Sequence, residues 1–529
     1  MAHLRVSVAP EEQALRVSWR LDGVTFDTGD VVALLPLSIA GAPTLRLGDE
    51  AVAATDERGP LGLSADVVED ADGEQLRVWT AVRPARGDVE ISYLAEPETD
   101  DPRAATPPLE LRAEGGGLSG ALKCFLLLPP GQDDATFELR WTAAGGGVFV
   151  TSLGETDGDD TVLTGAGLER LGDTYVMWGD LADRHLRDGE LSIWWLTEPG
   201  IDVEAFRARL GTTYRLMAET YGAPGRPYRV FLRTHPHRGL NGSAHPASFV
   251  MALNPDHPLD TGSIYETLAH ELVHEWLHLD GPVEDVTWYN EGAADYYSLV
   301  VPFRARLIEE DAFLAAVNLE ARECYANARR DLTIREAQRL FFTDFLAHRL
   351  PYARGMFYLA DLDTRLRRDT SGRQCVDDLV RDVVRRRSTG ERVGVEQWCA
   401  AVEDVLSIAE WPALEALVFT GTGRPGDGCF GPRFVQETVA VPVLDVGWDH
   451  STFLTRRIAG LRPGGAADEA GLLEGESVDL PKYLDILRLD VGDVLDVGVT
   501  RDGELVRLAL PVGDIVASVP QWRSTPSEP

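Results

Sequence analysis

The alternation of apolar and polar residues predicts strands in the first third of the chain. Short runs such as LRVSVA, LRVSWR, DVEISYLA, ATFELRW and GVFVTSL are separated by clusters of Gly, Asp and Pro. A period of two residues is typical of strands that bury one face. Residues 1–180 are therefore predicted to form an N-terminal β-sandwich-like domain.

The pattern changes to helical spacing at about residue 181. The stretch VEAFRARLGTTYRLMAETYG predicts a helix that ends at Gly222, and YRVFLR and ASFVMAL predict two strands. Several more helices are expected before the Gly- and Pro-rich stretch GTGRPGDGCFGPR. We assign residues 181–428 to a second domain, in which a mixed sheet precedes a mainly helical half.

The last segment, residues 435–517, returns to short strands, which are predicted for FLTRRI, VLDVGVTR and LVRLALPV. The tail WRSTPSEP is expected to be disordered. A chain of 529 residues is too long for one compact core, which agrees with three segments of different pattern. The predicted fold class is therefore multidomain α+β.

A net charge of −36 narrows the range of partners. Nucleic acid and anionic membranes would be repelled, so neither is expected to bind. The chain has no apolar run long enough to span a bilayer, and its first residues lack the features of a secretory signal. Five scattered cysteines favour reduced thiols over disulfides, and a cytoplasmic location is expected.

The stretch TLAHELVHEWLHLD, residues 267–280, contains a candidate metal site. His270 and His274 are four residues apart, so on a helix their rings project from one face and can share one ion. Glu271 follows the first histidine, placed to contact a water molecule on the ion. This is the His-Glu-x-x-His motif of zinc peptidases.

A catalytic zinc ion takes three protein ligands, and three residues compete for the third place. His278 continues the helical row but lies two turns from His270, about 12 Å along the axis. Asp280 has the spacing of the third ligand in metzincins, although Leu277 stands where those enzymes have glycine. Glu291 lies in a second predicted helix, in the stretch TWYNEGAADYYSLV.

The His-Glu-x-x-His motif is followed in order by the stretches WYNEGAADYY and PYARGMFYLADLDTRLR. In these three stretches the chain resembles the glycyl aminopeptidase family of gluzincin zinc metallopeptidases. The resemblance implies an N-terminal β domain, a thermolysin-like catalytic domain and a C-terminal PDZ domain. It also implies that His270, His274 and Glu291 hold one Zn²⁺ per chain, and that Asp295 hydrogen-bonds the first histidine. The stretch GGAADEAGLLEGESV, residues 464–478, is similar to bacterial PDZ domains.

The same resemblance implies the catalytic roles. Glu271 is expected to act as general base, and Tyr352 to stabilise the tetrahedral intermediate, with Arg354 where the family has lysine. The family's glutamate that binds the substrate's amino terminus has no charged counterpart in HRGLNGSAHPASFVMAL. Alignment on Gly239 and Leu240 places Asn241 there, and alignment on His245 and Ser248 places Ala244 there.

Asn241, Ala244 and Ser248 are accordingly the candidate substrate-binding residues. ASFVMAL is expected to be the edge strand that pairs with an extended peptide. His235, His237 and His245 are expected to be solvated loop residues.

The expected function is zinc-dependent hydrolysis of peptide bonds in peptide or protein substrates, by aminopeptidase or endopeptidase action. The alternative is an inactive gluzincin scaffold that binds peptides through its β and PDZ-like domains. The cluster of Glu271 and Tyr352 with three metal-ligand candidates favours the enzyme, because a binding protein has no need of a general base.

Overall fold

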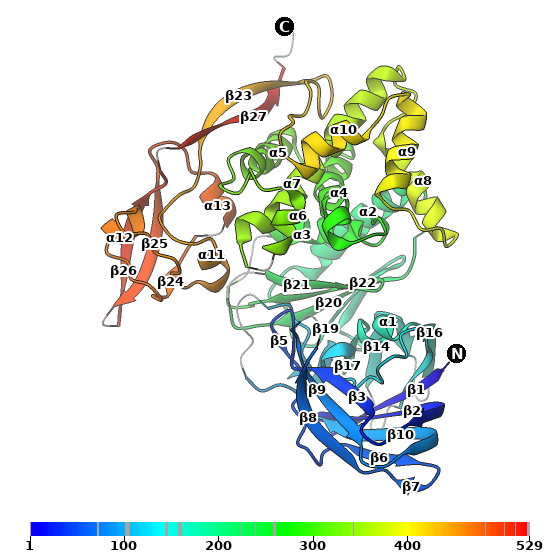
Figure 1. Cartoon of the computed structure of the whole chain (residues 1–529). Helices are drawn as coiled ribbons and strands as arrows, with labels where there is room; N and C mark the ends of the chain where they lie inside the picture. The colour runs from blue at the N-terminus through cyan, green and yellow to red at the C-terminus, as the bar shows by residue number, and fades with distance from the viewer. Residues whose placement is uncertain are drawn as a thin grey trace. The chain divides into compact units, whose positions relative to one another are not determined.

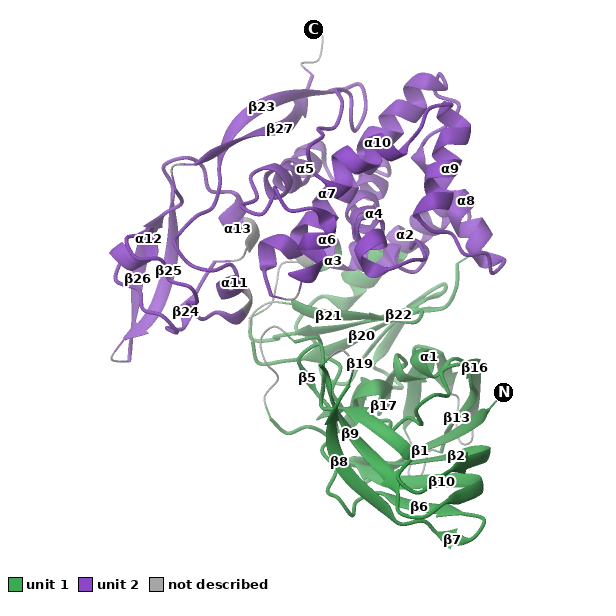
Figure 2. Ribbon diagram, in the orientation of Figure 1, with its two compact units in different colours: residues 1–211, 225–265 green, residues 212–224, 266–529 purple. Residues whose placement is uncertain are grey.

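The computed structural model describes residues 2–70, 73–100, 106–142, 147–156, 161–223, 225–237, 240–257, 261–341, 343–481, 483–501, 503–513 and 515–525. The chain forms two compact units, Met1–Gly211 with Gly225–Tyr265, and Thr212–Pro224 with Glu266–Pro529 (Figure 2). Strands predominate in the first unit and helices in the second, so the predicted mixed α and β composition is confirmed. The predicted boundaries near residues 180 and 430 remain predictions.

The largest sheet of the first unit has seven strands in the order β16-β13-β1-β2-β10-β6-β7. Its strands are β1 (His3–Glu11), β2 (Ala14–Phe26), β6 (Ala53–Asp56), β7 (Gly59–Pro60), β10 (Ala85–Ala95), β13 (Thr136–Trp141) and β16 (Thr161–Ala166). A three-stranded sheet is formed by β3 (Val31–Pro36), β9 (Gln75–Ala81) and β8 (Leu63–Glu69). The alternating runs of the sequence become strands with alternating buried positions, as predicted.

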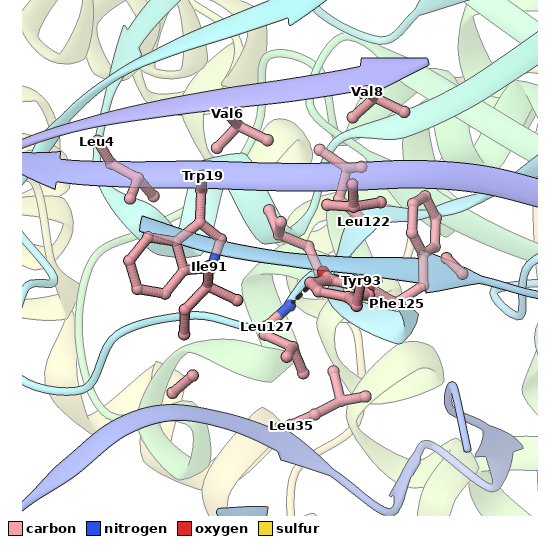
Figure 3. Packing of buried hydrophobic residues seen from close by; sticks show 14 of the residues in the cluster. Leu4, Val6, Val8, Trp19, Leu35, Ile91, Tyr93, Leu122, Phe125 and Leu127 are labelled. Atoms are coloured by element: carbon pink, nitrogen blue, oxygen red, sulfur yellow. Dashed lines mark hydrogen bonds between the residues drawn. The ribbon is translucent and has the colours of Figure 1, made fainter. Parts of the chain in front are cut away.

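The core of this unit contains large aromatic side chains (Figure 3). Trp19 of β2 lies opposite Ile91 of β10 in the antiparallel register, and both are fully buried. The hydroxyl of Tyr93 donates to the Phe125 carbonyl oxygen at 2.9 Å and accepts from the Leu127 amide at 3.0 Å. The one polar group of this ring is therefore satisfied inside the core, as a buried hydroxyl requires.

Two five-stranded sheets complete the first unit. One contains β11 (Arg112–Glu114), β12 (Gly117–Ala121), β17 (Tyr175–Gly179), β14 (Val148–Thr151) and β15 (Gly154–Thr156). The other contains β18 (His185–Asp188), β19 (Leu191–Trp195), β20 (Tyr228–Thr234), β22 (Ser248–Leu253) and β21 (Leu240–His245), in that order. The shorter elements are β4 (Ser38–Ile39), β5 (Ala42–Pro43), η1 (Leu122–Cys124) and α1 (Leu168–Gly172).

Two predictions about this second sheet are wrong. The strand in ASFVMAL, β22, lies between β20 and β21, so the edge strand is β21 instead. His245 ends β21 and is buried, as is His235, whereas both were expected to be solvated loop residues. Parallel pairing of β22 with β20 takes the apolar strand into the interior of the sheet and leaves the more polar β21 outside.

Helices form the larger part of the second unit (Figure 1). They are α2 (Val203–Tyr221) and α3 (Thr261–Val273), each shared with the first unit, α4 (Val283–Arg304), α5 (Glu310–Tyr325), α6 (Ile334–Arg339), α7 (Phe345–Asp369), α8 (Val376–Ser388), α9 (Val395–Leu406), α10 (Trp411–Leu414) and the π-helical turn η2 (Glu415–Phe419). The predicted end of a helix at Gly222 is confirmed. Among the described residues, no helix combines the length and apolarity needed to cross a bilayer.

Helices α4 and α7 pack against each other through two glycines. A Cβ atom on Gly292 of α4 would overlap the backbone of Gly355 in α7, and a Cβ on Gly355 would overlap the Trp288 carbonyl oxygen. The two backbones can approach this closely only because neither residue has a side chain. This contact brings together the helices that carry Glu291 and Tyr352.

The C-terminal part of the second unit contains β23 (Phe434–Pro442), α11 (Ser451–Thr455), α12 (Ala466–Glu469), β24 (Val478–Asp479), α13 (Tyr483–Leu487), β25 (Val494–Arg501), β26 (Glu504–Pro511) and β27 (Val516–Ser524). The strands predicted for VLDVGVTR and LVRLALPV are confirmed as β25 and β26. FLTRRI is not a strand, because its first residues belong to α11.

The predicted disorder of the tail is wrong at its beginning. Trp522 is 2% exposed, stacks on Phe357 of α7 with ring centroids 5.3 Å apart, and pairs with Asn318 of α5 through two hydrogen bonds. Burial of the large apolar ring of Trp522 stabilises an ordered conformation here, although the neighbouring residues of the tail are polar. Residues 526–529 lie outside the described part of the chain.

Candidate metal centre

Two helices bring together the three candidate ligands. His270 lies in α3, His274 directly follows the last residue of that helix, and Glu291 lies in the following helix α4. The Nε2 atoms of His270 and His274 are 3.3 Å apart. Oε2 of Glu291 lies 3.3 Å from Nε2 of His270 and 3.5 Å from Nε2 of His274. Among the described residues, this is the one group of at least three His, Cys, Asp or Glu whose ligand atoms all lie within 4.8 Å.

The separations of these three atoms fit a zinc ion. With bonds of about 2.0–2.1 Å, a tetrahedral ion holds its ligand atoms about 3.3–3.4 Å apart. The three measured separations of 3.3, 3.3 and 3.5 Å are close to that value. Two imidazole nitrogens with one carboxylate oxygen also form the donor set of many catalytic zinc sites, which keep a fourth position open.

Asp295 fixes the orientation of the first histidine. Its Oδ1 atom accepts a hydrogen bond of 2.7 Å from Nδ1 of His270. Because Nδ1 then carries the proton, the lone pair of the ring is on Nε2, the atom that faces His274 and Glu291. Asp295 follows Glu291 by one helical turn, so one face of α4 provides both carboxylates.

The charges around this group favour a positive ion. Burial alone would lower the pKa of His270, but the hydrogen bonds with Asp295 and Glu291 outweigh it and raise that pKa well above its ordinary value. Burial would raise the pKa of Glu291, yet both histidines hold it well below its usual range. The site therefore stabilises a cation between these residues, whether a proton or a metal ion.

Glu271 lies beside the three ligand atoms without joining them. Burial raises the pKa of its carboxyl group, and the neighbouring carboxylates Glu291 and Asp295 add to that rise. No described residue forms a hydrogen bond with the Glu271 side chain. A carboxylate with a raised pKa, next to a metal site, has the properties of a general base.

Tyr352 approaches the same centre from helix α7. Its ring is stacked against that of His270, with centroids 6.0 Å apart and an interplanar angle of 15°. Burial, followed by the charge of Glu291, raises the pKa of Tyr352 well above its ordinary value. The hydroxyl group is therefore protonated at neutral pH and can donate a hydrogen bond.

The two competing ligand candidates lie elsewhere. Helix α3 ends at Val273 and the chain turns, so His278 does not continue the helical row as expected. His278 is exposed and contacts Arg387 of α8. The carboxylate of Asp280 pairs with Arg387 at 2.7 Å and accepts from the Val393 amide at 2.8 Å. The loop is held against α4 by Asn290, whose Oδ1 accepts from the Leu279 amide.

The three candidate substrate-binding residues belong to the other unit. Asn241 and Ala244 lie in the edge strand β21, and Ser248 lies opposite His245 at the start of β22. Nδ2 of Asn241 donates to the Thr106 carbonyl oxygen at 3.0 Å. Ala244 is exposed, whereas Ser248 is 1% exposed. None of the three supplies a negative charge.

The overall architecture is similar to that of a solved protein. An aminopeptidase N family protein from Idiomarina loihiensis matches 99% of this chain and 98% of its own, with a TM-score of 0.65 and 14% sequence identity. The two chains share a fold.

Two further solved structures are less similar. They are an M1 zinc metallopeptidase from Deinococcus radiodurans, solved with a Tyr-Ser-Ala substrate (TM-score 0.46, 18% identity, 80% of this chain and 94% of that chain), and native yeast LTA4 hydrolase (TM-score 0.48, 13% identity, 80% and 68%). No protein-family model and no curated protein matches the sequence.

The sequence did not reveal Arg349, which links several groups behind the centre. Its guanidinium binds Glu323 of α5 at 2.9 and 3.0 Å, lies 3.5 Å from Oδ2 of Asp295, and is 4.2 Å from the centre of the Tyr352 ring. Glu320 of α5 lies 3.6 Å away. Burial and the charges of Asp295 and Glu323 raise the pKa of Glu320 well above its usual range.

A sequence signal for this network exists. Arg349 precedes Tyr352 by three residues, and Glu320 precedes Glu323 by three, so each pair lies on one face of its helix. Charged residues at that spacing within largely apolar helices indicate a buried ionic group. Which helices meet, however, is not determined by spacing.

Proposed function

We propose that this protein is a zinc-dependent metallopeptidase. The observation that carries the proposal is the triangle of His270, His274 and Glu291 ligand atoms, whose sides of 3.3–3.5 Å fit a tetrahedral zinc ion. The carboxylate of Glu271 beside it and the phenol of Tyr352 near it supply the two further groups that peptide hydrolysis uses. The shared fold with an aminopeptidase N family protein supports the same class.

The chemistry divides among a few groups. A zinc ion bound there supplies Lewis acidity, which polarises the substrate carbonyl and lowers the pKa of a water molecule towards neutrality. Glu271 takes a proton from the attacking water and passes it to the nitrogen of the leaving amine. Tyr352 donates a hydrogen bond to the oxygen on which negative charge develops.

Asp295 acts through His270 rather than on the substrate. The 2.7 Å hydrogen bond keeps the His270 ring in the tautomer whose Nε2 can bind a metal. The Arg349 guanidinium in turn lies 3.5 Å from the second oxygen of Asp295 and over the Tyr352 ring. We propose that these two residues preserve the geometry of the centre between turnovers.

We propose a peptide or protein as substrate. Among the described residues β21 is the edge strand of its sheet, and an extended peptide can add to a sheet edge as a further strand. Asn241 and Ala244 on this strand carry no charge to neutralise an amino terminus. Endopeptidase action is therefore as compatible with this strand as aminopeptidase action.

Two further expectations accompany this proposal. All five cysteines carry free thiols, which is typical of proteins in the reducing cytoplasm. The PDZ-like identity of residues 435–517 rests on the sequence resemblance, and we propose that this segment binds substrate peptides. Its strands β25 and β26 pair antiparallel, and the apolar core of this segment includes Leu495, Val497 and Val499 of β25 and Leu510 of β26.

Two measurements test the function. Zinc content is determined by elemental mass spectrometry after dialysis, and a peptide mixture with free or acetylated amino termini is then incubated with the protein and mapped. We expect about one zinc per chain and cleavage that a chelator abolishes. Cleavage of free termini alone indicates an aminopeptidase, and internal cleavage indicates an endopeptidase. A zinc-free protein that binds peptides without cleaving them would instead establish the scaffold.

A further inference from the structure

A polar cavity lies in the helical unit, lined by none of the candidate metal ligands, and has a volume of about 320 Å³. Three arginines line it: Arg330 from the loop after α5, Arg354 from α7, and Arg424 from the loop after η2. The hydroxyl groups of Thr420 and Thr422 line it as well. The volume is at the lower end of the range for small-molecule sites.

In the described part of the chain, no carboxylate lies within ion-pair distance of any of the three guanidinium groups. Among the described residues, none of them forms an ion pair, although the chain carries 86 acidic residues and only 50 basic ones. Arg354 is 2% exposed, and its guanidinium donates to two carbonyl oxygens, those of Val418 and Arg330. A buried positive charge that is satisfied by neutral oxygens alone is unfavourable unless an anion joins it.

The remaining arginines are held in place around the same space. Arg330 donates to the Asn327 carbonyl oxygen at 3.2 Å, and the Arg424 guanidinium lies 4.3 Å from the centre of the Tyr325 ring. One carboxylate, that of the exposed Asp331, also lines the cavity. Three positive charges against one negative charge leave the cavity positive in a strongly acidic protein.

The loop after η2 is shaped to contact the buried guanidinium. Gly421 has a φ of +65°, and a Cβ atom there would overlap the Arg354 side chain. This glycine therefore lets the backbone pass directly beside Arg354 and places the neighbouring threonine hydroxyls at the cavity. Those hydroxyls, Oγ1 of Thr420 and Oγ1 of Thr422, are 2.9 Å apart.

We propose that this cavity binds an oxyanion, either a phosphate group or a carboxylate. Guanidinium groups bind both by parallel N–H donors, and hydroxyl groups complete such sites. Arg354 and Tyr352 are two residues apart on α7, hence about 200° apart around the helix. The anion site and the metal centre therefore lie on opposite faces of one helix, and the anion is not the substrate of the metal centre.

Calorimetric titration of the full chain tests this proposal. Inorganic phosphate is one probe; the other is an acetylated tripeptide with a free carboxylate, compared with its amide. Each titration uses both zinc-loaded and chelator-treated protein, so that binding at the metal centre is separated from binding at the cavity. The variants are Arg330→Gln and Arg424→Gln, with Arg339→Gln on the exposed face of α6 as matched control.

We expect the chelator-treated wild type to bind at least one of the two probes. Each cavity variant should weaken that binding by about tenfold or more, because a charge-assisted hydrogen bond is lost, while Arg339→Gln should leave it unchanged. Phosphate binding alone identifies a free or esterified phosphate as the ligand, and binding of the peptide acid alone identifies a polypeptide terminus. Absence of binding by either probe, or equal binding by wild type and both cavity variants, overturns the proposal whatever the peptidase assay shows.

Discussion

Gly292 of α4 and Gly355 of α7 meet with no room for a side chain on either residue. Glu291, which precedes one glycine, contributes a ligand atom to the candidate metal centre, and Tyr352 lies one turn before the other. The separation of the two helices, and with it the distance from tyrosine to ligand, depends on this contact.

Gly355→Ala is accordingly expected to disturb both stability and metal binding. The added methyl group overlaps the Trp288 carbonyl oxygen, and overpacking of this kind costs about 1–3 kcal/mol of unfolding free energy. Urea unfolding and zinc titration measure the two effects. Gly48→Ala is the control, because nothing lies within 4 Å of a Cβ atom at that exposed position. Unchanged stability in Gly355→Ala would contradict the close packing.

Glu271→Gln is expected to keep its zinc and lose its activity. The amide preserves the shape of the side chain but cannot accept the proton, so kcat should fall by about 100-fold to 10,000-fold. Zinc content and peptide hydrolysis are measured on the same preparation. Glu284→Gln, at an exposed position of α4, is the matched control and should behave as wild type. Full hydrolysis by Glu271→Gln would refute the role of general base.

Asp295→Asn is expected to weaken zinc binding by about 10- to 100-fold, since the partner that orients His270 loses its charge. Competition with a chromophoric chelator gives the affinity. Asp311→Asn, on the exposed start of α5, removes the same charge elsewhere and should have no effect. If both variants bind zinc with wild-type affinity, the hydrogen bond between Asp295 and His270 does not contribute to zinc binding.

Tyr352→Phe is expected to lower kcat by about 100-fold, the usual loss when one donor to a developing oxyanion is removed. KM and zinc content should stay near wild-type values, because the ring still stacks on His270. Steady-state kinetics at several substrate concentrations separate the two constants. A change in KM with kcat unaltered would make Tyr352 a substrate-binding residue instead.

His245 is expected to make the first unit sensitive to acid. Its Nδ1 lies 2.8 Å from the Asp173 carbonyl oxygen, its buried Nε2 has no hydrogen-bond partner among the described residues, and burial lowers its pKa to about 4. The folded pKa is below the unfolded one of about 6.5, so the stabilisation is complete above pH 6.5 and is lost as pH falls towards 4.

The unfolding free energy should fall by on the order of 2–3 kcal/mol between pH 7 and pH 4 because of His245. Urea unfolding of wild type and His245→Asn at both pH values measures it, since the asparagine amide can still donate to the carbonyl of Asp173 but does not titrate. The difference between the two proteins should therefore shift with pH. A constant difference would assign the acid sensitivity to other groups.

Local interactions explain what was predictable. His270 lies in α3 and His274 directly follows its last residue, so the four-residue spacing brings both rings to the same side wherever that helix packs, because local backbone geometry sets it. The same holds for Glu291 and Asp295 on α4. The alternating strands of the first unit, including β1 and β2, also follow from a short-range period.

The predictions that were wrong concern residues whose surroundings are set by segments distant in the chain. The strand in ASFVMAL is internal because β20 and β21 pair with its two sides, and His245 of β21 is buried beside Tyr175 and the Asp173 carbonyl oxygen. Trp522 lies in a polar tail, yet it is ordered because Phe357 and Asn318 are more than 150 residues away in sequence and adjacent in space. No local period contains such information.

The sequence by itself determined which residues can bind a metal ion, since side-chain chemistry and helical spacing are local properties. Spacing alone left Glu291, His278 and Asp280 open as the third ligand; the family resemblance implied Glu291, and the tertiary structure brings its carboxylate to the two rings. It also brought Arg349 behind Asp295, and gathered Arg330, Arg354 and Arg424 around one cavity. The physical reason is that which helices pack together depends on the fit of whole helix faces, as at Gly292 and Gly355. The packing energy is a sum over residues that lie far apart in the chain.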